Sequence, residues 1–193
     1  SNKKIMHKDF QKFIDDTRKS HFTSFTYFYR SIFSKWLERS LIKEFDAKEE
    51  HFVVTEKTIY AKLDLYKRGI ADKFSQILSQ NKDKSNLTID LRDNFGGYVS
   101  ECMKICNLLL PRCKMLTQVF KDRVVSYKSD RNMYAFEKIM VLVNENTASS
   151  AEILAYALKK NLLMCELIGP KTVGKYVGQD FFVNEKYNYI FSV

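Results

Sequence analysis

The chain has 193 residues, 45% of them hydrophobic, which is enough for one domain with a buried core. It contains no run of about 18 apolar residues, which excludes a membrane-spanning helix in this sequence, and no signal peptide is visible. Lysine and arginine total 32 against 23 acidic residues. Because the two signs are interleaved, the net charge of +9 predicts a solvated surface and no nucleic-acid partner.

The first 50 residues are rich in aromatic side chains and show mostly helical periodicity. Phe10, Phe13 and Ile14 fall on one helical face, and a similar pattern resumes over residues 25–45 after an interruption at residues 20–24. We therefore expect an N-terminal helical segment of two or three helices over residues 1–50, and a core domain over residues 51–193.

Strand and helix patterns alternate through the rest of the chain. We expect helices over residues 70–80 and 99–110, the second ended by Pro111. Apolar and alternating runs predict strands at residues 52–65 (two strands with a turn at Glu56-Lys57), 87–91, 115–120, 124–127, 139–143, 180–183 and 187–193. This alternation is typical of the α/β class.

Four cysteines are present, and none forms a Cys-x-x-Cys pair of the kind that binds metal. Cys102 and Cys106 lie four residues apart on a predicted helix, so free thiols buried in the core are the expected state. The sequence therefore predicts no metal site.

Residues 139–179 combine a strand, a polar turn and a helix that opens on two serines. The strand covers Ile139 to Val143, the turn Asn144 to Thr147, and Ser149 and Ser150 stand at the start of the helix. A serine at that position is most often an N-cap. Nucleophilic use needs a base, and the three histidines all lie in the first third of the chain. A lysine in an apolar surrounding could take that role, and Lys175 follows a glycine-bounded loop over residues 169–174.

Three motifs in this chain resemble those of the C-terminal processing, or tail-specific, serine proteases. The first is TASSAE at residues 147–152, and the second is Gly174-Lys175 followed by Gln179. The third is LTIDLRDNFGG at residues 87–97, similar to the family's strand and glycine turn. The resemblance extends from about Thr58 to the C-terminus, and it implies an α/β core of the crotonase/ClpP-like β-β-α type. It also implies hydrolysis of peptides through an acyl-enzyme.

The resemblance implies a role for each matching residue. Ser149 would be the nucleophile, with Ser150 as its competitor within the motif. Lys175 would act as general base and later as general acid, and Gln179 would orient it. The oxyanion hole would use the backbone N–H of Ser150 and an N–H of the Gly96-Gly97 turn. No metal or organic cofactor is expected.

Two departures from the family leave alternatives open. Only about twenty-five residues, 30–54, lie where the family usually carries a PDZ domain, and Phe95 replaces the usual proline before the glycine pair. Relatives without a PDZ domain, such as the nisin-resistance proteins, use an N-terminal histidine with the same serine, and His21 loosely resembles it. A Ser149-His21 dyad is therefore the alternative mechanism, and a catalytically inactive peptide-binding relative is the alternative function.

We expect a peptide or protein substrate, cleaved near a C-terminus, and no transmembrane segment. The resemblance places the protein outside the cytoplasm or at the cell envelope. The chain stops soon after its last predicted hairpin, where the family continues, so the core is expected to be truncated at its C-terminus or completed by a partner chain. A homo-oligomer is one such arrangement.

Overall fold

The computed structural model describes residues 27–30, 50–120, 122–130, 134–175, 181–184 and 189–192. The chain divides into two compact units, residues 1–43 together with 177–193, and residues 44–176. The sequence had assigned the last hairpin to the core domain, whereas this division groups it with the N-terminal residues. Most of residues 1–50, where helices were predicted, lies outside the described residues. The described exceptions are the short strand at residues 27–30 and residue 50.

The described part of the smaller unit is a three-stranded antiparallel sheet of order β1-β10-β9. It consists of β1 (Tyr27–Arg30), β9 (Phe181–Asn184) and β10 (Tyr189–Ser192). The predicted C-terminal hairpin is confirmed, but the predicted helix is wrong at Tyr27–Arg30. Tyrosine and phenylalanine favour strands, and pairing with β10 outweighs a helical spacing that was weak over these four residues.

The larger unit is built on a five-stranded sheet of order β2-β3-β4-β7-β8. The strands are β2 (His51–Val54), β3 (Thr58–Lys62), β4 (Asn86–Asp90), β7 (Lys138–Leu142) and β8 (Cys165–Ile168). The edge strand β2 is antiparallel to β3, and the remaining pairs are parallel. The strands predicted at residues 52–65, 87–91 and 139–143 are thereby confirmed.

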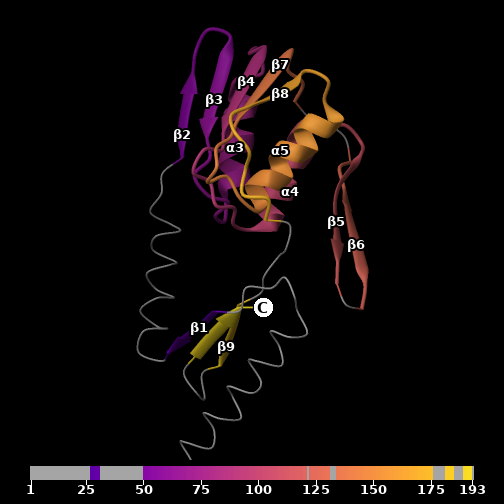
Figure 1. Ribbon diagram of the computed structural model, residues 1–193. Helices are drawn as coiled ribbons and strands as arrows, with labels where there is room; N and C mark the ends of the chain where they lie inside the picture. Colours follow the sequence, from indigo (N-terminus) through magenta and orange to yellow (C-terminus); the bar gives the residue numbers. More distant parts are fainter. Residues whose placement is uncertain are drawn as a thin grey trace, which may run out of the picture. The chain divides into compact units, whose positions relative to one another are not determined.

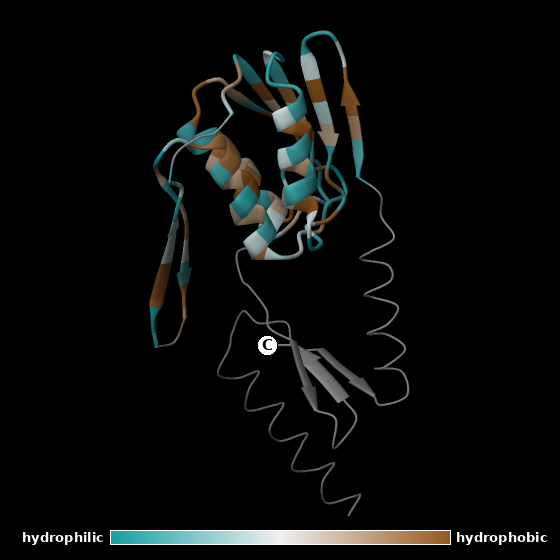
Figure 2. Ribbon diagram, turned by 180° about the vertical axis from the view of Figure 1, so that it is seen from behind, coloured by the Kyte–Doolittle hydropathy of each residue, from teal (hydrophilic) through white to brown (hydrophobic). Residues whose placement is uncertain are grey.

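Helices α3 (Ile70–Gln80), α4 (Val99–Leu109) and α5 (Ser150–Asn161) connect the parallel strands and cover one face of the sheet (Figure 1). Crossover connections between parallel strands are almost always right-handed. Because β3, β4, β7 and β8 follow one another across the sheet in chain order, all three connecting helices lie on the same face. Hydrophobic residues alternate with hydrophilic ones along these helices (Figure 2). In α3 the buried residues are Ile70, Ala71, Phe74 and Leu78, which is the spacing of one helical face.

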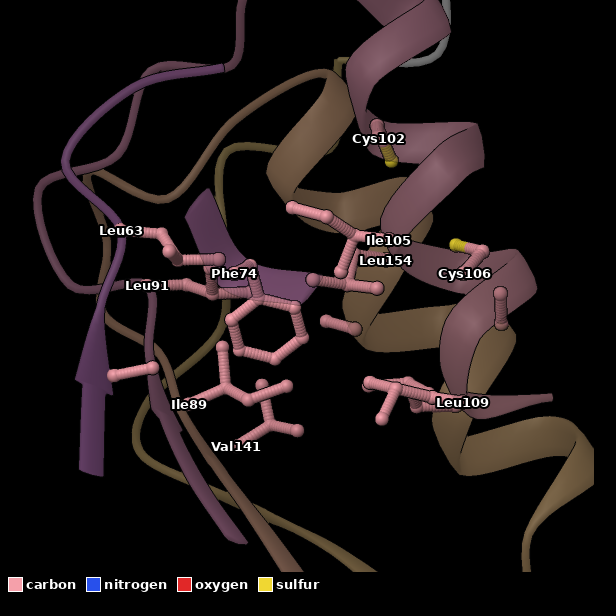
Figure 3. Packing of buried hydrophobic residues seen from close by; sticks show 14 of the residues in the cluster. Leu63, Phe74, Ile89, Leu91, Cys102, Ile105, Cys106, Leu109, Val141 and Leu154 are labelled. Atoms are coloured by element: carbon pink, nitrogen blue, oxygen red, sulfur yellow. The ribbon is translucent and has the colours of Figure 1, made fainter. Parts of the chain in front are cut away.

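The core lies between this sheet face and the helices. Phe74 of α3 packs near Ile89 of β4 and Val141 of β7, with Ile105 and Leu109 of α4 on the far side (Figure 3). Each of these side chains is almost completely buried, and burial of one such group stabilises the fold by roughly 1.5–3 kcal/mol. Cys102, Cys106 and Cys165 are buried here as free thiols, as the sequence predicted.

A two-stranded hairpin, β5 (Lys114–Val119) and β6 (Val124–Lys128), is inserted between α4 and β7. It confirms the hairpin predicted from the alternating residues. Leu116 and Tyr127 pack against the core, while Val119 and Val124 near the tip are exposed.

The segments that follow parallel strands all lie at the carboxyl-terminal edge of the sheet, where the strands end and where α/β proteins usually bind ligands. In this chain, β4, β7 and β8 lead into residues 91–97, 143–149 and 169–175. All three sequence motifs therefore meet at the same edge. In the part of the chain that the structure describes, no helix is both long and apolar enough to cross a membrane.

Candidate active site

Ser149 occupies a strained backbone position between the polar turn and α5. Its φ of 57° and ψ of −122° lie in a region that residues with a Cβ rarely adopt. Such a conformation costs on the order of 1–3 kcal/mol and persists only where neighbouring contacts impose it. Here the N–H of the neighbouring residue Ala148 donates to the carbonyl of Asn94 at 2.9 Å. This bond joins the turn before Ser149, called the serine turn (residues 143–149), to the glycine turn after β4 (residues 91–97).

The two adjacent serines have different surroundings. Ser150 is fully buried, and its hydroxyl donates to the carbonyl of Gly97 at 2.9 Å. Ser149 is only partly buried. The structure therefore commits the Ser150 hydroxyl to holding the glycine turn and leaves Ser149 as the more accessible hydroxyl.

Side-chain amides join the turns that follow β4 and β7. The carboxylate of Asp93 accepts hydrogen bonds from the amide groups of Asn144 and Asn146, both at 2.9 Å. In return, the backbone N–H of Asp93 donates to the side chain of Asn144 at 2.9 Å. Asp93 has a φ of 63°, which aspartate tolerates better than most residues. These bonds fix the glycine turn and the serine turn to each other.

Asn94 links three segments from a fully buried position. Its side-chain amide donates to the carbonyl of Leu63 at 2.6 Å, and its side-chain oxygen accepts the N–H of Gly96 at 2.8 Å. Its own carbonyl accepts the N–H of Ala148. Sequence analysis had used this asparagine only as part of the motif, and its bonding role was missed.

Gly96 lies directly against the serine. A Cβ atom at this position would come within 2.8 Å of the Ser149 Cβ and 3.1 Å of the Ser150 nitrogen, which no ordinary contact allows. The φ of Gly96 is 105°, a value that also requires glycine. The expected approach of the glycine turn to the serine is therefore present.

The N–H groups of this turn point in different directions. The N–H of Gly96 is bonded to Asn94, and the carbonyl of Gly96 accepts the N–H of Tyr66 at 2.8 Å. Because the peptide bond is trans, the N–H of Gly97 points away from Tyr66. Within the described ranges, neither the Gly97 nor the Ser150 N–H has a hydrogen-bond acceptor.

Glu152 joins the serine to the loop that carries Lys175. One carboxylate oxygen accepts the N–H of Ser149 at 2.8 Å and that of Lys175 at 2.9 Å. The other accepts the Thr172 hydroxyl and the Gly174 N–H, both at 2.6 Å. Sequence reasoning gave Glu152 no role, although the spacing Ser149-x-x-Glu152 is the signature of a capping box and could have indicated one.

Lys175 is partly buried and is positioned through its backbone N–H. A second bond, from the N–H of Val173 to the carbonyl of Thr147 at 3.1 Å, also joins this loop to the serine turn. Gln179 and His21 lie outside the described residues.

A charged cluster stands where β4 ends. Burial of Asp90 acts to raise the pKa of its carboxyl group, but hydrogen bonds from Arg92 and Tyr60 outweigh it and hold that pKa at about 2. Asp90 is thus an ionised, fully buried anchor beneath the glycine turn.

Comparison with known proteins assigns the family. The model of "Peptidase family S41" matches residues 57–189. The carboxyl-terminal-processing protease of Picosynechococcus sp. (strain ATCC 27264 / PCC 7002 / PR-6) is 33% identical over 132 residues, covering 66% of this chain and 31% of the relative. That of Synechocystis sp. (strain ATCC 27184 / PCC 6803 / Kazusa) is 33% identical over 116 residues, covering 60% and 26%. The chain therefore spans less than a third of these relatives' length.

A solved structure with the same core is the photosystem II D1 C-terminal processing protease. Its TM-score is 0.58 at 24% identity, with 70% of this chain and 36% of that chain covered. A lipoprotein from Streptococcus agalactiae gives a TM-score of 0.64 at 14% identity, with 87% and 63% covered. These likenesses confirm the α/β core. Together with the family match over most of the chain, they confirm the resemblance drawn from the three motifs: the chain belongs to peptidase family S41.

Proposed function

We propose that this chain is the core of a serine endopeptidase that cleaves peptides or protein tails through an acyl-enzyme on Ser149. The observation that carries the proposal is the placement of Ser149. It stands in a strained turn, directly against a glycine turn that presents an N–H without an acceptor. Acyl transfer needs a nucleophile with N–H donors beside it, and this edge of the sheet combines the two.

The proposed oxyanion hole consists of the N–H groups of Gly97 and Ser150. Both lack an acceptor among the described residues, and the Ser150 hydroxyl bonded to the Gly97 carbonyl keeps the two residues adjacent. The N–H of Ser150 lies at the start of α5, where the helix dipole favours developing negative charge. Gly96 is the less suitable donor, because its N–H is already bonded to Asn94.

Lys175 is the proposed general base, oriented by Gln179. The lysine must be neutral to accept the serine proton, and it would return that proton to the leaving amine. Glu152 supports this assignment, because its carboxylate ties the backbone of Lys175 to that of Ser149. No metal or organic cofactor takes part in this mechanism.

One panel of variants, assayed for peptide cleavage across pH, tests the mechanism. We expect Ser149→Ala, Lys175→Ala and Lys175→Arg to be inactive, because a guanidinium stays protonated and cannot act as a base. We expect His21→Ala to retain most activity. The Ser149-His21 alternative predicts the reverse for the single variants, with a pH midpoint near the histidine value of about 6.5.

Labelling with a serine-reactive phosphonate, followed by mapping of the modified residue, tests the nucleophile directly. Modification of Ser149 is the expected result, and modification of Ser150 would overturn the assignment. A chain that binds peptides but is neither labelled nor able to cleave them would be the inactive relative. Ser150→Ala should weaken cleavage without abolishing it, because its hydroxyl supports the turn.

The proposed substrate is an exposed peptide near a C-terminus, in keeping with the names of the processing-protease relatives. The proposed place of action is outside the cytoplasm or at the cell envelope. Fractionation of cells that express the full-length protein would test the location.

A further inference from the structure

We propose that Arg68 and Tyr98 form a carboxylate-recognition element that selects acidic groups on the substrate. This inference rests on the proposed peptidase function. The guanidinium carbon of Arg68 lies 5.4 Å from the centre of the Tyr98 ring, which is a cation–π contact. Both side chains are exposed, and they stand beside the glycine turn that faces Ser149.

Backbone hydrogen bonds hold this pair in place. The N–H of Tyr66 donates to the Gly96 carbonyl and the N–H of Tyr98 donates to the Tyr66 carbonyl, each at 2.8 Å. These bonds form a parallel bridge between Tyr66 and Gly97. The bridge is tight, because a Cβ on Gly97 would meet the Tyr66 backbone at 2.6 Å. The bridge therefore fixes the backbone of Tyr66, two residues before Arg68, to the glycine turn that precedes Tyr98.

The charge of Arg68 has no acidic partner in the described part of the chain. Three carboxylates of nearby segments are paired with lysines: Glu50 with two lysines at 3.1 and 3.3 Å, Asp64 with Lys62 at 3.3 Å, and Glu101 with Lys104 at 2.8 Å. Asp72, in the first turn of α3, is exposed to solvent and forms no ion pair with Arg68. Arg68 is held against an aromatic ring beside the proposed site, and no carboxylate of the described residues pairs with it. Such an arginine is suited to a carboxylate supplied by a ligand.

Arginine is the side chain best matched to a carboxylate. Its planar guanidinium can donate two parallel hydrogen bonds, and stacking on an aromatic face leaves the N–H groups at its edge accessible. We place the bound carboxylate within a few residues of the scissile bond, because Tyr98 directly follows the glycine turn that packs against Ser149. The carboxylate would be either the terminal group of a substrate tail or an Asp or Glu side chain close to the cleavage point.

Paired peptides of identical sequence, one ending in a free carboxylate and one in an amide, test the proposal. We expect Arg68→Gln to lower kcat/KM for the carboxylate peptide by roughly tenfold or more, mainly through KM, as for the loss of a charge-assisted hydrogen bond. The amide peptide should be cleaved equally by both proteins if the terminal carboxylate is the ligand. If the side-chain carboxylate is the ligand, the loss should instead follow an Asp placed near the cleavage point and vanish with Asn there.

Arg123→Gln is the matched control, because Arg123 is also exposed and stacks on a ring, that of Phe120 at 4.3 Å, but lies on the hairpin. It should leave the ratio of the paired peptides unchanged. Tyr98→Leu should give a smaller loss of the same selectivity, since the guanidinium remains. An equal loss on every peptide in Arg68→Gln would indicate a structural role and overturn the proposal.

The two proposals can fail separately. Binding of the same fluorescent peptides to Ser149→Ala protein, measured by anisotropy, does not require turnover. Wild-type protein that cleaves no peptide would contradict the peptidase function, while a carboxylate preference that Arg68→Gln removes would still support the recognition element. Peptides that bind with equal affinity, whether or not they carry a carboxylate, would contradict the recognition element alone.

Discussion

The segments after β4 and β7 are fixed in a different way from the segment after β8. The first two are joined by a network in which Asp93, Asn94, Asn144 and Asn146 all take part. The loop after β8, which carries Lys175, is joined to the serine mainly through one carboxylate, that of Glu152. Several side chains hold the segments that carry the nucleophile and the proposed oxyanion hole in place. Fewer side chains hold the loop that carries the proposed base.

This difference fits the demands of the proposed chemistry. Stabilisation of an oxyanion depends on donors that are fixed before the reaction begins, so redundancy in the network favours it. A base must approach the nucleophile and then turn to the leaving group, which a loop held by few groups permits. We therefore expect the segments after β4 and β7 to be disturbed mainly by a substitution that pushes them apart. The loop after β8 should be disturbed by replacement of one residue, Glu152.

The largest effect is expected from Gly96→Ala. The added Cβ would lie 2.8 Å from the Ser149 Cβ and would push the two turns apart. We expect kcat/KM to fall by roughly 1,000-fold, comparable to the loss of an oxyanion donor. Steady-state cleavage of one peptide by the two proteins measures the change.

Gly69→Ala is the control for this substitution. Gly69 also has a positive φ, of 84°, but no atom lies within 4 Å of the position of its Cβ. It shares the conformational cost of about 1 kcal/mol without the steric clash. Equal losses of activity in the two variants would show that the contact with Ser149 is unimportant.

The second effect in size is expected from Glu152→Gln. The carboxylate accepts four hydrogen bonds, whereas glutamine has one acceptor oxygen and would turn its amide group toward N–H donors. The Lys175 loop should detach while the fold persists. We expect kcat to fall roughly 100-fold, as for a catalytic group displaced by about 1 Å, with little change in the free energy of unfolding.

Glu145→Gln provides the comparison, since Glu145 is an exposed residue of the turn that precedes the serine. It should cleave peptides at the wild-type rate. If Glu152→Gln were equally active, other contacts would have to hold the base, and the contrast between the two regions would disappear.

Much of this arrangement followed from the sequence, because its signals are local. Strands such as β4 and β7 are short apolar runs ended by polar turns, and α3 shows its buried face in the spacing of Ile70, Phe74 and Leu78. The three motifs follow successive parallel strands, so their meeting at one edge could be predicted once the α/β class was recognised.

The rest depended on contacts that sequence spacing does not encode. The choice between Gly96 and Gly97 turns on which N–H is already bonded to Asn94. The capping-box spacing could have indicated the bond from Ser149 to Glu152, but the bonds of Glu152 to the Lys175 loop come from residues up to 23 positions away. The strand at Tyr27–Arg30 requires a partner near the far end of the chain, so its local pattern was misleading.

The third effect concerns Asp90, which ends β4 beneath the network. Its folded pKa of about 2 is below the ordinary value of 3.8, so the ionised group stabilises the fold above about pH 4 and this contribution is lost as pH falls toward 2. We expect Asp90→Asn to lower the free energy of unfolding by about 2 kcal/mol at pH 7. Urea unfolding between pH 7 and pH 2 should show this difference shrinking to less than half. A difference independent of pH would indicate lost packing instead.

The smallest effect is expected from Asn146→Ala, which tests the redundancy of the network. Asn146 donates one hydrogen bond to Asp93, but Asn144 donates to the same carboxylate oxygen and also accepts the Asp93 N–H. Because Asn146 is exposed, water can replace the lost donor, and the free energy of unfolding should fall by less than about 1 kcal/mol. Cleavage should stay within about threefold of wild type, since the turns remain joined. A loss as large as that of Glu152→Gln would mean that the serine side of the site also depends on single contacts.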